Sequence, residues 1–112
     1  MVKMKVVDAG MKETEAHLKY ITREGVGKDG GSPVTYGEGT LEIEPGKVGH
    51  QIRCLLLPKG GVPELRPLVE SAVAEMQRHT GKKLNWVAVE HHNAKHPHAH
   101  LVAMSAETHQ EM

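Results

Sequence analysis

The sequence predicts an α+β protein in which an antiparallel sheet carries two helices on one of its faces. Two observations support this class. Strand-like apolar segments lie near the start, in the middle and near the end of the chain, and two segments with helical spacing lie between them. The chain has 112 residues, close to the commonest size of one domain. We expect a single domain with a glycine-rich flap at residues 25–49 and a polar tail at residues 105–112.

The first part of the chain predicts a strand and then a helix. Residues 2–7 alternate between apolar and polar side chains, as expected of a half-buried strand. Residues 12–23 have helical spacing, with Leu18 and Ile21 on a shared face. Gly25 follows and is expected to end the helix, because glycine commonly stands just after the last helical residue.

The glycine-rich flap predicts a long loop. We expect two short strands within it, over residues 34–36 and 40–44, joined by turns. Long loops in compact domains often carry function. A solvated flap without a function is the alternative interpretation of the same composition.

The second half of the chain predicts a strand, a helix and two further strands. Residues 48–57 are expected to form a long strand, nearly continuous in apolar side chains after Arg53, which favours a strand in the centre of the sheet. An amphipathic helix follows, with Pro63 suited to its first position and Gly81 to its C-terminal cap. Residues 84–90 and 97–104 complete the sheet and are joined by a polar connection.

The composition limits the class of protein. Lysine plus arginine and aspartate plus glutamate both number 14, which argues against non-specific coating of DNA, because such binding scales with the phosphates neutralised. A local groove for a short single strand is compatible with this balance. The lone cysteine, Cys54, gives neither a disulfide framework nor a thiolate metal site. No apolar run is long enough to cross a bilayer, so we expect a soluble cytoplasmic protein without a membrane partner.

Residues 90–100 contain five of the nine histidines. In a strand His98 and His100 point to the same face, and His91, at the end of the preceding strand, can be folded back beside them. Three neutral imidazoles can bind a divalent metal ion and leave positions open for water or substrate. A histidine-rich surface loop, or adventitious metal binding, is the alternative. Unpaired imidazoles that face a core would be costly, which favours the metal site.

A metal ion held in this way can activate water or polarise a phosphoryl oxygen. The chain has no nucleophile elbow, no P-loop and no His-Glu-x-x-His motif. Tyr20 is the candidate nucleophile, because a tyrosine hydroxyl can form a covalent intermediate with a metal-polarised phosphate. A packing role is the more usual one for a tyrosine in a helix.

Residues 86–102 resemble the metal motif of the conjugative relaxases, which are mobilisation nucleases of the HUH endonuclease superfamily. The superfamily is named for two histidines that flank a hydrophobic residue, as at residues 98–100. Residues 17–26 resemble the segment that carries the nucleophilic tyrosine of these enzymes. Residues 50–53, with residues 57–58 and the helix after them, resemble their central strand and helix. The resemblance spans nearly the whole chain in order.

This resemblance implies a five-stranded antiparallel sheet flanked by helices, and site- and strand-specific nicking of DNA. Tyr20 would attack the scissile phosphate to form a 5′-phosphotyrosine linkage and leave a free 3′-hydroxyl. His91, His98 and His100 would hold a divalent ion, Mg²⁺ or Mn²⁺ and in some members Zn²⁺, that stabilises charge on the transition state. No nucleotide cofactor is needed, because the phosphotyrosine keeps the energy of the broken bond.

Three residues within this motif have less specific predicted roles. Asn93 stands where relatives often carry a polar residue that orients a metal ligand. His92 and His96 either contact a DNA phosphate or face solvent. The sequence leaves these two readings open.

Three residues further away in the sequence also have less specific predicted roles. His50 and Arg53 are candidates for contact with the phosphate backbone, and His50 is equally well explained as a polar residue at a strand end. Tyr36 would stack on a base, act as an alternative nucleophile or pack beside the flap, and packing is the simplest of these.

The implied substrate is single-stranded DNA at an origin of transfer or a similar nick site, with accessory mobilisation proteins as partners. Relaxase domains commonly continue past the histidine strand, whereas this chain stops eight residues after Met104. A homodimer would replace part of the surface that such extensions provide. The alternatives to a nicking enzyme are an inactive DNA-binding module with the same fold and a histidine-rich metal-binding protein.

Overall fold

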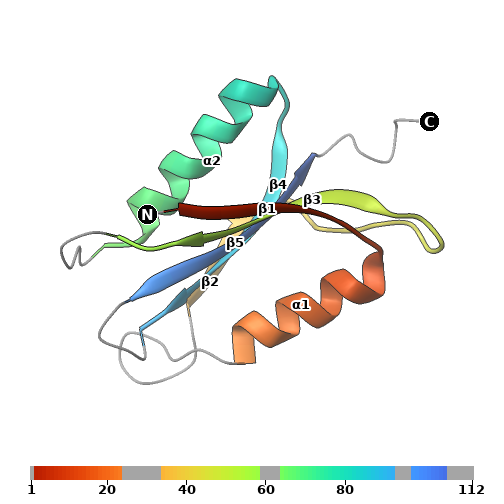
Figure 1. Ribbon diagram of the computed structural model, residues 1–112, viewed down its shortest axis with the longest axis horizontal. Helices are drawn as coiled ribbons and strands as arrows, with labels where there is room; N and C mark the ends of the chain where they lie inside the picture. The colour runs from red at the N-terminus through yellow and green to blue at the C-terminus, as the bar shows by residue number, and fades with distance from the viewer. Residues whose placement is uncertain (1, 24–33, 59–63, 93–96, 106–112) are drawn as a thin grey trace.

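A computed structural model describes residues 2–23, 34–58, 64–92 and 97–105 of the chain (Figure 1). Its elements are β1 (Val2–Ala9), α1 (Met11–Arg23), β2 (Val34–Glu38), β3 (Gly49–Leu56), α2 (Arg66–Thr80), β4 (Leu84–His91) and β5 (His98–Ser105). These five strands and two helices confirm the α+β class. Neither helix combines the length and the apolar character that crossing a membrane requires.

The strands form one antiparallel sheet in the order β1-β3-β5-β4-β2. The middle strand of the sheet is β5, and residues 48–57, predicted as a strand in the centre of the sheet, form the inner strand β3 beside it. β3 lies between β1 and β5 and is an inner strand, which explains its apolar composition. β4 and β5 pair over their full length, from Leu84 opposite Ser105 to His91 opposite His98.

The two helices cover opposite faces of the sheet (Figure 1), so the prediction that both pack on one face is wrong. Leu101 of β5 packs in one core cluster with Val69 and Val73 of α2. The next residue, Val102, packs in the other cluster with Ile21 of α1. Successive side chains of a strand point to opposite faces, so the continuous apolar run of β5 requires cover on both sides.

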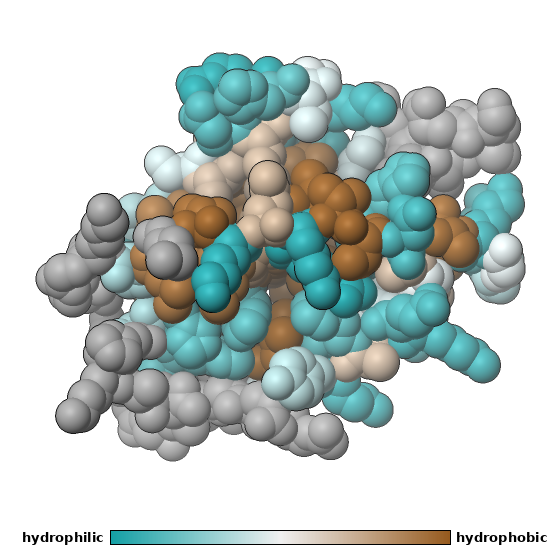
Figure 2. Space-filling view, in the orientation of Figure 1, coloured by the Kyte–Doolittle hydropathy of each residue, from teal (hydrophilic) through white to brown (hydrophobic). Residues whose placement is uncertain are grey.

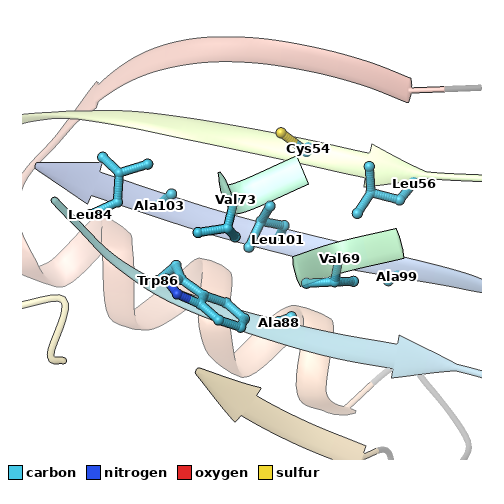
Figure 3. Packing of buried hydrophobic residues seen from close by; sticks show 10 residues of the cluster. All are labelled: Cys54, Leu56, Val69, Val73, Leu84, Trp86, Ala88, Ala99, Leu101 and Ala103. Carbon is cyan, nitrogen blue, oxygen red and sulfur yellow. The ribbon is translucent and has the colours of Figure 1, made fainter. Parts of the chain in front are cut away.

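The core on the α2 side is apolar and spans β3, β5 and β4 (Figure 3). α2 begins at Arg66 with Pro67 in its first turn, so it starts later than a helix with Pro63 at its first position; Pro63 lies outside the described residues. The predicted C-terminal cap is confirmed. Gly81 has φ 69°, and its N–H donates to the carbonyl oxygen of Gln77 at 2.9 Å.

β1 forms one edge of the sheet and is more exposed than the predicted half-buried strand. Val2, Met4 and Val6 share one face and are 54%, 61% and 64% exposed. Among the described residues, the apolar core on the α2 side takes no member from β1. Figure 2 shows hydrophobic residues at the surface along the middle of the view, where β1 crosses in Figure 1.

Part of the predicted flap packs as a core segment. β2 is present and runs two residues beyond the predicted short strand. The second short strand, over residues 40–44, is wrong, because Gly39 breaks the chain with φ 72° and the following residues are irregular. Leu41 and Ile43 are buried in the cluster on the α1 side, so their alternation reflects packing rather than pairing. Residues 24–33 lie outside the described part of the chain.

Candidate metal centre

The pairing of β4 with β5 brings three histidines together on the α1 side of the sheet. His91 lies directly opposite His98, and His100 lies two residues further along β5. The ring centroids are 5.1 Å apart for His91 and His98, 4.7 Å for His91 and His100, and 5.4 Å for His98 and His100. One ring nitrogen from each histidine lies within 4.8 Å of the others. The structure thus gathers the three predicted ligands from two neighbouring strands.

This set of donors fits a divalent transition metal. Three imidazole nitrogens are a common protein ligand set for such an ion, and they leave coordination positions for water or substrate. The site lies at the end of the strand pair rather than in the middle of the core, since His98 is the first residue of β5 and His91 the last of β4. A bound ion would therefore be reachable from outside the sheet.

His91 is anchored to α1. Its Nε2 lies 2.5 Å from the carbonyl oxygen of Ile21. A carbonyl oxygen only accepts, so the ring donates from Nε2 and presents its lone pair at Nδ1. Histidine ligands commonly give their other N–H to such a partner, which fixes the orientation of the ring. Both residues are buried, so this contact fixes the last turn of α1 against the histidine cluster.

His100 is electrically neutral at physiological pH. Burial lowers its pKa to about 4, with further contributions from His91, His98 and His17. The neutral ring is the form that binds a metal ion. It also allows three imidazoles to lie side by side without mutual repulsion. The His100 ring is therefore in the protonation state that a metal ligand requires.

Tyr20 lies on α1 immediately before the residue that contacts His91. Tyr20 is 56% exposed, so it is accessible from solvent. His17, one turn earlier on the same side of the helix, lines a hollow together with His100. The segment of α1 from His17 to Ile21 therefore borders the histidine cluster, and Tyr20 projects from that segment on its exposed flank.

Arg53 lies on the same face of the sheet as the histidine cluster and lines the hollow beside His100. Its Nε and Nη2 donate to the side-chain oxygen of Gln51 at 3.3 and 3.2 Å. His50 does not join the cluster. It pairs with Asp8, its side chain is exposed, and it lies five residues along β3 from Leu55, the partner of His100, or roughly 16 Å.

Tyr36 lies on the α2 side of the sheet, opposite the histidine cluster. Its hydroxyl donates to Glu90 at 2.7 Å, its ring meets Trp86 edge to face at 6.0 Å, and the Arg66 guanidinium lies 4.4 Å from its centroid. Burial and the bond to Glu90 raise the pKa of Tyr36 well above its usual range. Of the three predicted roles, the structure shows packing.

His92 also points away from the triad. Its Nε2 lies 2.9 Å from the Glu90 carboxylate, and its side chain is only 9% exposed, so it does not face solvent. Glu90, which the sequence did not single out, thereby receives bonds from both His92 and Tyr36 at the end of β4. Asn93 and His96 lie outside the described residues.

The sequence also did not single out the residues that surround Arg53. His17 could have been found from its place on the same helical face as Ile21, four residues later. Lys3 and Lys5 could have been found from the alternation of β1, which puts them together on one face. Thr14 and Gln51 gave no signal, because their burial depends on the packing of α1 on β3.

Comparisons with family models, with curated proteins and with solved structures give no match for this chain.

Proposed function

We propose that this protein is a metal-dependent DNA-nicking transesterase of the relaxase type. The observation that carries the proposal is the convergence of His91, His98 and His100 beside the segment of α1 that bears Tyr20. The substrate is single-stranded DNA at an origin of transfer or a similar nick site of a mobile element. Such an enzyme would work in the cytoplasm with accessory mobilisation proteins.

The chemistry is a transfer of one phosphodiester bond. The Tyr20 oxygen attacks the scissile phosphorus and loses its proton, the bond from phosphorus to the 3′-oxygen breaks, and the 3′-oxygen takes up a proton. The products are a 5′-phosphotyrosine and a free 3′-hydroxyl. A divalent ion, Mg²⁺, Mn²⁺ or Zn²⁺, would polarise the phosphate oxygens and stabilise the charge that develops on them.

The residues of the chain supply orientation for this step. The Ile21 carbonyl fixes the His91 ring, and this contact holds the backbone of the α1 segment that bears Tyr20 against the metal centre. The neutral state of His100 keeps its lone pair available at physiological pH. The two strands that carry the histidines are fully paired, which gives the rigid support that a catalytic geometry needs.

The test is the formation of a covalent adduct. The protein is incubated with Mn²⁺ and a diverse pool of labelled single-stranded oligonucleotides and then run on a denaturing gel. We expect an adduct that is lost in Tyr20→Phe and in His98→Ala. The matched control is Tyr36→Phe, which removes the same hydroxyl from the other tyrosine of the chain, on the opposite face of the sheet, and should keep the adduct.

Two other outcomes identify the alternative functions. Binding of the oligonucleotides that is indifferent to Tyr20→Phe, without any adduct, would show a DNA-binding module. Tight binding of zinc without affinity for DNA would show a protein that sequesters metal through its histidines. An adduct that survives Tyr20→Phe would contradict the assignment of the nucleophile.

A further inference from the structure

A hollow lies beside the metal centre, between α1 and the part of the sheet formed by β1 and β3. Its volume is about 480 Å³. Its polar lining consists of Lys3, Lys5, His17, Arg53 and, at the border with the metal centre, His100. We call these five residues the basic hollow.

The strand register places the basic hollow and the metal centre on one continuous surface. Lys5 lies opposite Arg53, and Lys3 lies opposite Leu55, which in turn lies opposite His100. Directly opposite residues of antiparallel strands project to the same face. Lys3 on β1 and His100 on β5 are separated by two strand spacings, so the backbone of Lys3 lies roughly 10 Å from that of His100.

The cation at the centre of this surface is held by neutral partners. The Arg53 guanidinium donates to the side-chain oxygen of Gln51, which is fully buried. The Gln51 amide donates to the Thr14 hydroxyl at 2.5 Å, and that hydroxyl donates to the Gly10 carbonyl oxygen at 2.8 Å. Burying an amide side chain costs free energy unless its hydrogen bonds are made. The hydrogen bonds of Gln51 are made to Thr14 and to Arg53, and the latter orients the Arg53 guanidinium.

This arrangement leaves the charge of Arg53 available to a ligand. Gln51 satisfies the guanidinium without neutralising it, as a carboxylate would. Burial lowers the pKa of Arg53, and the charge of Glu13 on α1 opposes that shift; the Glu13 carboxylate itself accepts a bond from the Gly10 N–H at 2.6 Å. In a chain whose charges balance at 14 of each sign, this surface gathers three full cations beside a metal site.

We propose that the basic hollow is a phosphate-binding subsite that holds the nucleic-acid strand next to the phosphate at the metal centre. Lys3, Lys5 and Arg53 contact the phosphodiester backbone, and Gln51 is the positioning residue for Arg53. The strand accordingly runs from the metal centre towards the β1 edge of the sheet. The identification of the ligand as a DNA strand rests on the proposed function.

The test compares two double variants that remove the same charge. Lys3→Gln/Lys5→Gln removes two lysines of the basic hollow, and Lys82→Gln/Lys83→Gln removes two exposed lysines that do not line it. Both are made in the Tyr20→Phe protein, so that binding is measured without covalent capture. The probe is a fluorescent oligothymidylate, and its dissociation constant is measured by anisotropy over a series of salt concentrations with Mn²⁺ present.

We expect the variant in the hollow to bind about tenfold more weakly at low salt, and its plot of log K against log salt to be shallower by about 1.4, or 0.7 for each lost phosphate contact. The control variant should keep the slope of the Tyr20→Phe protein. Equal slopes and affinities in the two variants would overturn the subsite. Circular dichroism of both variants shows whether they remain folded; both replacements are at exposed positions.

A second probe separates a strand from a free anion. Inorganic phosphate should displace the oligothymidylate only at concentrations far above those of the strand itself, because it offers one phosphate instead of several. Displacement at comparable concentrations would show a site for free phosphate and overturn the strand path.

The two proposals can fail independently. If the wild-type protein forms an adduct and Lys3→Gln/Lys5→Gln leaves strand binding unchanged, the subsite is overturned and the nicking function is kept. If Lys3→Gln/Lys5→Gln loses strand binding and the wild-type protein forms no adduct, the subsite is kept and the result counts against the nicking function.

Discussion

The two faces of the sheet are built from the same strands and differ in chemistry. On the α2 side β5 contributes Ala99, Leu101 and Ala103, which are buried in an apolar cluster. On the α1 side the same strand contributes two histidines at its start, and its apolar residues follow only later. The same strands thus build an apolar core on the α2 side and, at the start of β5 on the α1 side, the candidate metal centre.

Two buried polar side chains of the α1 side, His91 and Gln51, are hydrogen-bonded to α1. His91 is bonded to the last turn of α1, and Gln51 is bonded to its first turn through Thr14. An apolar cluster that includes Ile21 and Val102 lies between these two contacts and holds the helix to the sheet. The comparison teaches that α1 both covers a core and orients a site, whereas α2 serves packing.

The largest effect that separates the two faces is expected for His100→Ala. Loss of a direct ligand should weaken binding of Mn²⁺ or Zn²⁺ by more than the roughly 10–100-fold typical of a lost outer-shell partner. The adduct should disappear as well, while the thermal unfolding of the metal-free protein changes little. Isothermal titration calorimetry measures the affinity. A variant that binds the ion as tightly as the wild-type protein would break the assignment of His100.

Leu101→Ala changes the neighbouring residue on the other face and should have the opposite profile. Its side chain is fully buried among α2 and three strands, so truncation should lower the free energy of unfolding by about 2–5 kcal/mol. Urea denaturation measures this loss. The folded protein should bind metal with its original affinity, and a large loss of affinity would show that the two faces are coupled.

The sequence predicted the elements better than their arrangement. Alternation in β1 and the amphipathic spacing of α2 are local properties, and both elements are present close to the predicted residues. The side of the sheet that each helix covers depends on contacts between distant segments. The continuous apolar run of residues 101–104 did carry that information, because a strand segment that is apolar on both faces needs cover on both.

The same limit applies to the site. His98 and His100 could be placed on one face from their spacing alone, and the pairing that adds His91 followed from a short connection. The basic hollow was not predicted as a whole. Lys3 and Lys5 share a face by alternation, but the hollow's residues come from β1, α1, β3 and β5 and meet only through the strand register. The bonds of Tyr36 and His92 to Glu90 could not be predicted for the same reason, because the three residues meet only in the folded chain.

The stability of the metal-free protein should depend on pH through the α1 side. The pKa of His100 is lowered from 6.5 to about 4 by burial and by His91, His98 and His17, and the pKa of His17 is also lowered. In the unfolded chain these rings take up protons below their ordinary pKa of 6.5, while the folded protein resists protonation. The neutral rings therefore contribute fully to the free energy of unfolding above pH 6.5, and this contribution is lost as the pH falls towards 4.

The measurement is the urea midpoint of the metal-free protein across this pH range, in the wild type and in His100→Asn. The amide replaces a titrating ring by a neutral polar group, so the variant should lose less stability between pH 6.5 and about 4 than the wild type loses. Identical pH profiles would contradict the assignment of the dependence to His100. Leu101→Ala is the control on the other face, and its profile should run parallel to that of the wild type.

The smallest effect is expected for Tyr36→Phe, which probes whether the α2 side influences the site. Loss of the hydroxyl removes one bond to Glu90, whose carboxylate keeps His92, so the free energy of unfolding should fall by about 1 kcal/mol. Because Glu90 directly precedes His91 on β4, a shift of its carboxylate is the shortest route between the two faces. Unchanged metal affinity alongside this small loss would show that the pairing of β4 with β5 holds His91 without help from the α2 side. A loss of affinity larger than the loss of stability would instead make Glu90 and Tyr36 supports of the metal centre, and the two faces would then form one functional unit.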